Sequence, residues 1–303
     1  MSDDGKLTET EARVAGVAFG YLTRCTSAGS AFFAEILTRP RAGSQAESAL
    51  RDKDLMEPIL IAGMYLHVAL DHYLSLRTMF IPGEVPPGAP ASEVRNYAPY
   101  TIVRAALEGD AWACWLLDPS VEPAERLARA MTVRAKNLHE VQRLGLTDDN
   151  GKPIDYEERA ANIEAVADRH NLKKKLNDQK ELEWVGAPPT TMTRLLDELL
   201  PERSPDTNGK ILGRHTYGLL SARAHGNPWA VLHNAKRAGS MGPHVGIAEV
   251  VIDAVELMRL LSIALRLHGE AFRRAGSLDG REPREWEARC GSIVESRLAD
   301  PTR

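Results

Sequence analysis

The sequence of 303 residues lacks the patterns that mark several common classes of protein. It has three cysteines, an odd number without C-x-x-C spacing, which argues against a disulfide framework and a structural zinc site. The N-terminus has no apolar signal-peptide region, and no N-x-[S/T] glycosylation acceptor occurs. The longest apolar stretch, from Ile59 to Leu70, is too short to span a bilayer. We therefore expect a protein of the reducing cytoplasm, with no membrane segment.

Motifs for nucleotides, acyl transfer and metals are missing as well. The chain contains no G-x-G-x-x-G, no P-loop, no G-x-S-x-G and no H-E-x-x-H. None of the nine histidines has a glutamate three residues before it, so the E-x-x-H pair of di-iron bundles does not occur. We predict no metal and no cofactor. The formal charge of −4 argues against a dedicated nucleic-acid binder, so nucleic acid is not an expected partner.

What the sequence does contain is a helical pattern. Apolar residues recur at intervals of three and four, and no convincing run alternates with a period of two. The spacing predicts helices over 8–37, 52–80, 92–117, 121–145, 155–182, 190–200, 208–225 and 246–275, with a ninth near 282–298. The expected fold is an all-α, single-domain bundle of eight or nine helices over residues 1–275, followed by a charged C-terminal segment, 276–303.

Two ionisable residues interrupt the apolar helix predicted at 92–117. Arg104 and Glu108 are four residues apart, so they share one face of that helix. The rest of the helix is apolar on both sides, and buried charges are costly unless they are paired. The two residues form either an ion pair that tethers neighbouring helices or part of a polar pocket in which both bind a ligand.

A second pair, His67 and Asp71, lies in the helix predicted at 52–80. Its stripe includes Leu60, Met64 and Leu74, so we expect the pair to point inward or to lie at the edge of the stripe. An aspartate fixes the tautomer of an imidazole, which suits a general base and also a metal ligand. A core histidine with a satisfied hydrogen bond is the alternative. His67 and Asp71 are candidate catalytic residues.

Arg134 lies within the apolar stripe of the helix predicted at 121–145, whose other basic residues are explained by a solvated face. A buried arginine needs a carboxylate partner, and we expect Glu108 to supply it. Arg134 is therefore the third candidate ligand-binding residue, beside Arg104 and Glu108.

The helix predicted at 208–225 ends on His225, where the helix dipole favours a protonated imidazole. Gly218, Ser221 and Ala222 share its face, and small residues let another backbone or a ligand approach closely. His225 is either a capping histidine or a third candidate catalytic residue. In the second case its imidazole would lie beside a pocket and would be charged or would transfer a proton. The irregular segment 226–246 is long enough to form a lid or binding loop.

The motifs T-x-x-R-x-x-x-E at 101–108 and S-x-x-x-H-G at 221–226 resemble those of an all-helical actinobacterial family of uncharacterised function. W-L-L-D-P at 115–119 and P-W-A at 228–230 are similar too. More distantly, the pattern over about 55–270 resembles the HEPN-like superfamily of helical bundles. The resemblance implies a HEPN-like core and a role in stress response or phage defence.

Catalytically active members of that superfamily are metal-independent ribonucleases, whose signature is an arginine followed, after four to six residues, by a histidine. His225 lacks an arginine at this distance, since Arg223 and Arg214 lie two and eleven residues before it. Arg134 and His139 fit the spacing but lack the usual polar residue after the arginine. The resemblance thus implies ribonuclease activity only through Arg134 and His139, exposed together at a dimer interface.

Three functions remain open. The first is a non-catalytic HEPN-like protein that binds a small ligand, a nucleotide or a protein partner. The second is an enzyme with a small-molecule pocket between helices, in which His67 and Asp71 form the base and Arg104 or Arg134 binds an anion; a metal-dependent variant would use Asp71, Glu108 and histidines. The third is a ribonuclease. The apolar stripe of 247–267 is either part of the core or the seam of a homodimer, and a homodimer is compatible with each function.

Overall fold

The computed structural model describes residues 9–80, 97–147, 150–178, 182–186, 190–203, 209–225, 227, 235–242, 245–250 and 254–290. Within these ranges the chain forms ten helices and two short antiparallel hairpins. The protein is mostly helical, which confirms the prediction of an all-α helical bundle.

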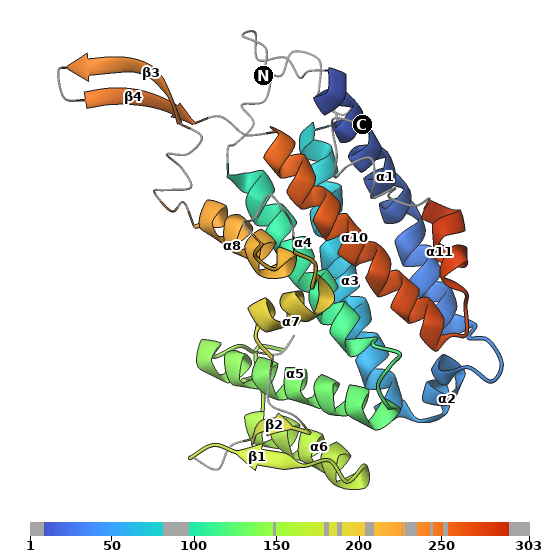
Figure 1. The fold of residues 1–303 in the computed structure, drawn as a ribbon. Coiled ribbons are helices and arrows are strands. Elements are labelled where there is room, and N and C mark those ends of the chain that lie inside the picture. Colours follow the sequence, from blue (N-terminus) through green and yellow to red (C-terminus); the bar gives the residue numbers. More distant parts are fainter. Residues whose placement is uncertain are drawn as a thin grey trace.

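Four long helices lie side by side and form the main bundle (Figure 1): α1 (Glu9–Thr38), α3 (Lys53–Phe80), α4 (Ala98–Leu116) and α10 (Ala254–Leu278). α4 packs against both α3 and α10. Its Gly109 permits a close approach to α3, because a Cβ at this position would lie 2.9 Å from the carbonyl oxygen of Tyr65. Large side chains such as Tyr73, Tyr100 and Phe272 fill the interior between the helices.

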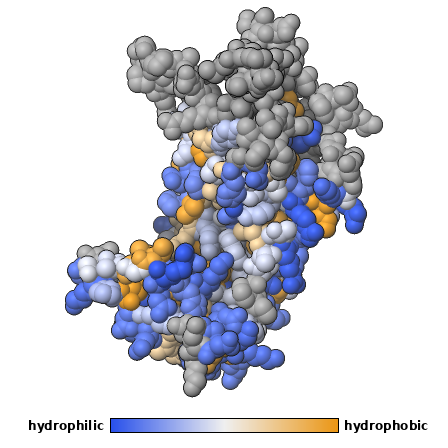
Figure 2. Space-filling view, turned by 90° about the vertical axis from the view of Figure 1, so that its left-hand side faces the viewer, coloured by the Kyte–Doolittle hydropathy of each residue, from blue (hydrophilic) through white to orange (hydrophobic). Residues whose placement is uncertain are grey.

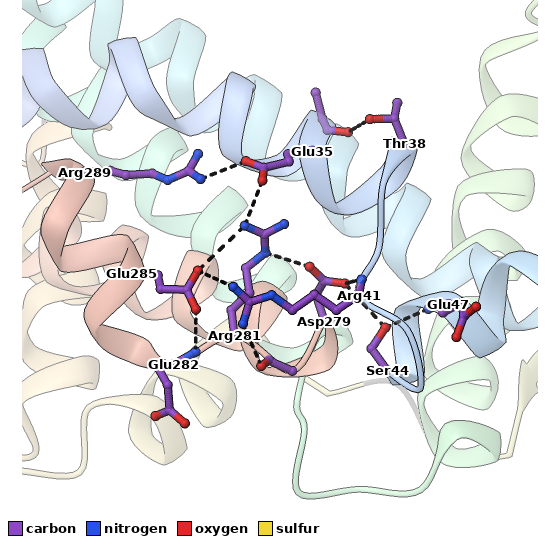
Figure 3. A network of polar contacts seen from close by, with 12 residues as sticks. Glu35, Thr38, Arg41, Ser44, Glu47, Asp279, Arg281, Glu282, Glu285 and Arg289 are labelled. Atoms are coloured by element: carbon purple, nitrogen blue, oxygen red, sulfur yellow. Dashed lines mark hydrogen bonds and ion pairs between the residues drawn. The ribbon is translucent and has the colours of Figure 1, made fainter.

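A polar network closes one end of the bundle (Figure 3), where α2 (Gln45–Arg51) and α11 (Pro283–Cys290) join α1 and α10. Nε of Arg281 donates to Asp279 at 2.6 Å, and its Nη1 donates to Glu35 at 3.1 Å. Asp279 is fully buried, so this pairing offsets a desolvation cost that would otherwise destabilise the fold. α11 belongs to the predicted charged segment 276–303, and its Trp286 is buried against Phe272.

The lower part of the molecule in Figure 1 consists of α5 (Pro123–Leu144), α6 (Tyr156–Arg169) and the hairpin of β1 (Lys174–Leu176) with β2 (Leu182–Val185). α5 has a proline at its first position and ends at Gly145, whose φ of 61° is left-handed. The Thr132 hydroxyl donates to the Val185 carbonyl at 2.6 Å and accepts from the Val185 amide at 3.1 Å. These two hydrogen bonds hold β2 against α5.

Two shorter helices, α7 (Met192–Leu199) and α8 (Leu212–Ala224), lie between the bundle and the lower part, and both contact α4. Gly213 of α8 has no room for a Cβ beside the carbonyl of Leu196, so the two helices meet closely. Arg223, which is 3% exposed, joins α8 to α10 through Glu256 at 2.9 Å. The hairpin of β3 (Ala235–Gly242) and β4 (Val245–Val250) extends away from the bundle in Figure 1.

Two of the predicted helices are shorter than expected. The helix expected at 155–182 ends at Arg169, because Asn171 adopts a left-handed φ of 52° and the chain turns into β1. The helix expected at 246–275 begins at Ala254, and residues 245–250 belong to β4. The expected irregular segment 226–246 therefore contains β3. The first residues of the helix expected at 92–117 lie outside the described residues.

The apolar stripe of 247–267 does not form an exposed seam where it runs along α10. Leu257, Leu261 and Leu265 are 1% exposed or less and belong to the core of the bundle. This part of the stripe is consequently unavailable as a dimer interface.

Candidate functional site

Arg104 of α4 is the centre of a polar cluster with side chains from α4 and α8. Its Nε lies 2.9 Å from Oε1 of Glu108, its Nη1 lies 3.1 Å from Nε2 of His225, and its Nη2 donates to the Tyr217 hydroxyl at 3.1 Å. The guanidinium also lies over the Tyr217 ring, 5.3 Å from its centroid. The structure therefore brings together three of the predicted site residues, Arg104, Glu108 and His225.

The ion pair in this cluster is partly buried. The side chains of Arg104 and Glu108 are 23% and 34% exposed. Burial alone lowers the pKa of Arg104, but the contacts with Tyr217 and Glu108 outweigh it and raise the pKa above its usual value. A guanidinium carries two N–H groups on each terminal nitrogen. Among the described residues, one N–H on each of Nη1 and Nη2 of Arg104 has no protein acceptor and is available to a ligand.

His225 accepts a hydrogen bond in this arrangement. An arginine side chain can only donate, so Nε2 of His225 is the acceptor and the ring proton is on Nδ1. The protonated imidazole expected at the end of α8 does not fit this hydrogen bond. While the bond exists, Nε2 is not available to take a proton from a substrate, so the geometry favours a positioning role for His225 over that of a general base.

A cleft of about 620 Å³ opens to solvent beside the cluster, and its volume is typical of sites for small molecules. Its walls come from α4, α5, β2, α8 and the N-terminal end of α7 with the two residues before it. Figure 2 shows a side of the molecule on which hydrophilic side chains predominate over the lower part, formed by α5, α6 and the β1–β2 hairpin. Arg104, Glu108 and Tyr217 connect the cluster to the cleft, since all three line it.

Two basic and three acidic side chains line the cleft. Each of its three carboxylates lies within 2.9 Å of a basic partner, in the pairs Glu108–Arg104, Glu140–Arg143 and Glu183–Lys175. Lys136 has no carboxylate partner among the described residues, and its ammonium lies 5.6 Å from the centroid of the Trp112 ring. The wall formed by Lys136 and Trp112 thus offers a cation next to an aromatic ring.

His67 and Asp71 lie elsewhere, on the exposed face of α3. Their neighbours Leu60, Met64 and Leu74 are 46%, 69% and 42% exposed. The prediction that this stripe points inward is wrong, because α3 is apolar on most of its circumference and packs against α1 and α4 with its other faces. Since His67 and Asp71 do not line the cleft, they cannot provide its base.

Arg134 does not meet Glu108, as the sequence had suggested. It pairs instead with Glu57 of α3 at 3.1 Å, and its side chain is 33% exposed. His139 lines the cleft, but its Nε2 donates to the Leu182 carbonyl at 2.6 Å, and the Tyr156 hydroxyl lies 3.4 Å from its Nδ1. Five residues of α-helix turn the chain by about 140° net, so Arg134 and His139 point to different sides of α5.

A buried polar triad in the main bundle was not predicted from the sequence. Asp110 accepts from the Tyr73 hydroxyl at 2.8 Å and lies 2.6 Å from Nδ1 of His268, and all three side chains are completely buried. Burial raises the pKa of Asp110, although His268 and Tyr73 act in the opposite direction. The signal was available: Asp110 follows Val103, Ala106 and Leu107 on one helical face. The triad joins α3, α4 and α10 and does not line the cleft.

One group of ligand-type residues was also absent from the predictions. Asp52, Asp54 and His170 offer atoms that lie within 4.8 Å of one another, a spacing that could hold a metal ion. However, the same Oδ2 of Asp54 accepts from Nε and Nη2 of Arg169 at 2.9 and 2.8 Å. The guanidinium already supplies the positive charge that a metal would bring, so we assign this group to the packing of α6 on α3.

No protein-family model matches the chain, and comparisons with curated proteins and with solved structures give no match either. The function must therefore be argued from the cleft and its side chains.

Proposed function

We propose that the protein binds a small organic anion in the cleft beside Arg104. The observation that carries the proposal is the convergence of Arg104, Glu108 and Tyr217 on one wall of a solvent-open cleft, with Lys136 on another. The carboxylates of the cleft are paired, whereas Lys136 and two N–H groups of Arg104 are left for an acidic group of the ligand. Trp112, over whose ring Lys136 lies, adds an apolar surface to the same wall.

Binding is favoured over catalysis by the surroundings of the two histidines nearest to this cleft. Nε2 of His225 accepts from Arg104, and both ring nitrogens of His139 lie at hydrogen-bonding distance from protein groups. The separation of Arg134 and His139 around α5 gives ribonuclease chemistry little support. We further propose a HEPN-like core, a place in the cytoplasm and a role in stress response or phage defence, as the resemblance implies.

Calorimetric titration with indole-3-acetate and adenosine monophosphate, and with adenosine as the neutral control, tests the proposal. We expect saturable binding of at least one of the two anions and none of adenosine. Lys136→Met and Arg104→Met should each weaken binding by about tenfold, which corresponds to about 1.4 kcal/mol. Lys53→Met, at an exposed lysine outside the cleft, should leave the affinity unchanged. Absence of binding, or binding that neither cleft variant alters, would overturn the proposal.

A further inference from the structure

The exposed face of α3 is strongly apolar. Four of the ten large hydrophobic side chains exposed in the described part of the chain lie on it: Leu60, Met64, Val68 and Leu74. At 100° per residue they form, with His67 and Asp71, one stripe about 120° wide. From residue 60 to residue 76, Asp71 is the only acidic residue, and lysine and arginine do not occur. A face that meets water would carry more charge, so the stripe is typical of a contact surface.

We propose that this stripe is the interface between two copies of the chain. The α3 helices of the two copies run antiparallel, and the two-fold axis that relates them passes at the level of Ala69 along the helix. In this arrangement, residues at equal distances on either side of the axis face each other. Met64 then faces Leu74 of the partner subunit, and His67 faces Asp71 of the partner subunit. Each contact occurs twice, because the axis relates the two copies.

This register is selected by charge complementarity. It places His67 opposite the one carboxylate of the stripe, and it places Met64, the most exposed apolar side chain of the stripe, opposite Leu74. Moving the axis by one helical turn in either direction would place Asp71 opposite Leu60 or Leu74. In those registers Asp71 loses the imidazole of the partner subunit and faces an apolar side chain, which is unfavourable for a carboxylate. A second copy therefore satisfies the polar and apolar residues of the stripe together.

A lipid bilayer is the other occupant to consider. By length and composition alone, α3 is apolar enough to cross a membrane. Its remaining faces, however, are packed against α1 and α4, with Leu66 and Tyr73 buried there. Lipid would also offer no partner for Asp71 in the middle of the stripe. The second copy accounts for Asp71 as well as the apolar residues.

Light scattering combined with size-exclusion chromatography tests the proposal on the full chain. We expect the wild type to have twice the mass of one chain. Met64→Glu should raise the dissociation constant by about 100-fold or more, since it buries an unpaired charge opposite Leu74 of the partner subunit. Leu144→Glu, at a side chain that is 59% exposed on α5, is the matched control and should leave the dimer intact. Circular dichroism melts establish that each variant is folded.

Charge reversal distinguishes a second copy from any other occupant. His67→Glu should weaken the dimer because two carboxylates then face each other across the axis, and Asp71→Lys should weaken it because His67 then faces a lysine in place of its carboxylate partner. The double variant His67→Glu/Asp71→Lys should restore it. A monomeric wild type, a dimer that Met64→Glu does not weaken, or failure of the double variant to restore the dimer would overturn the proposal. If the wild type is monomeric and binds phosphatidylcholine vesicles, and Met64→Glu abolishes that binding, a lipid surface is the occupant of the stripe instead.

Discussion

Arg104 and His225 are 121 positions apart in the sequence, yet Nη1 of the first lies 3.1 Å from Nε2 of the second. The contact exists because α8 packs on α4 and ends at His225, which brings the imidazole to the guanidinium. It joins the last turn of α8 to the wall of the cleft. The cleft thus depends on how two helices far apart in the sequence are held together.

The contact fixes the tautomer of His225, and Arg104→Lys tests this. A lysine cannot engage Glu108, His225 and Tyr217 at once, because it lacks the planar fork of the guanidinium. We expect the imidazole of His225 to lose its fixed Nδ1–H form and to become a mixture of tautomers, measured from ring nitrogen shifts by NMR. His139 is the internal control: its Nε2 donates to Leu182, so its opposite tautomer should persist. An unchanged His225 spectrum would contradict the assignment.

Asp54 makes a testable contribution to acid stability. Burial raises the pKa of its carboxyl group, but Arg169 and His170 outweigh burial and lower the pKa below its usual value. The unfolded pKa is about 3.9, so this stabilisation is fully present above that pH and is lost as the pH falls through the lower folded value. Asp54→Asn should lower the free energy of unfolding by about 1–3 kcal/mol near neutral pH.

The measurement is a series of urea titrations of wild type and Asp54→Asn from neutral to acidic pH. The difference in stability should shrink below about pH 4, because the Asp54 carboxyl of the unfolded chain is protonated there before that of the folded protein. Glu140→Gln removes an exposed ion pair with Arg143 and should change stability by less than about 1 kcal/mol. A difference for Asp54→Asn that is the same at every pH would contradict the ion-pair explanation.

The buried triad predicts that two substitutions of Asp110 lower the free energy of unfolding by different amounts. Asp110→Ala leaves the Tyr73 hydroxyl and Nδ1 of His268 without their acceptor, and should destabilise the protein by about 3 kcal/mol or more. Asp110→Asn retains an acceptor oxygen and avoids the charged form that burial disfavours, as the raised pKa of Asp110 indicates. It should therefore cost clearly less in denaturant titrations. Equal losses for the two variants would contradict the stabilising role given to the retained acceptor oxygen.

Helix positions were predictable where the local signals are strong. The helix expected at 121–145 matches α5 closely, because a proline begins it and Gly145 ends it in the left-handed conformation. The helix expected at 155–182 failed because its end depends on Asn171, a residue that also occurs inside helices. No short-range sequence pattern indicated β1, because its three residues are all exposed and show no alternation of apolar and polar side chains.

The site was predictable only in part, and the reason is the same for each failure. Arg104 and Glu108 pair within one turn of one helix, so their spacing sufficed. Arg134 has Glu57 as its partner, and that choice is made by the packing of α5 on α3. The orientation of His67 was misjudged because α3 is apolar on its exposed face too, so periodicity does not tell which face is buried.

The close approach of α7 and α8 gives a last prediction, on the shape of the cleft. A Cβ at Gly213 would overlap the carbonyl of Leu196, and backbone cannot yield as a flexible side chain does. Gly213→Ala should force the helices apart and cost about 1–3 kcal/mol or more. On the same helix, a Cβ at Gly218 meets no atom within 4 Å, so Gly218→Ala should stabilise by about 0.5–1 kcal/mol. Thermal melts compare the two substitutions, which differ only in what surrounds the added methyl group. Because α7 and α8 both line the cleft, Gly213→Ala should also weaken anion binding, whereas Gly218→Ala should preserve it.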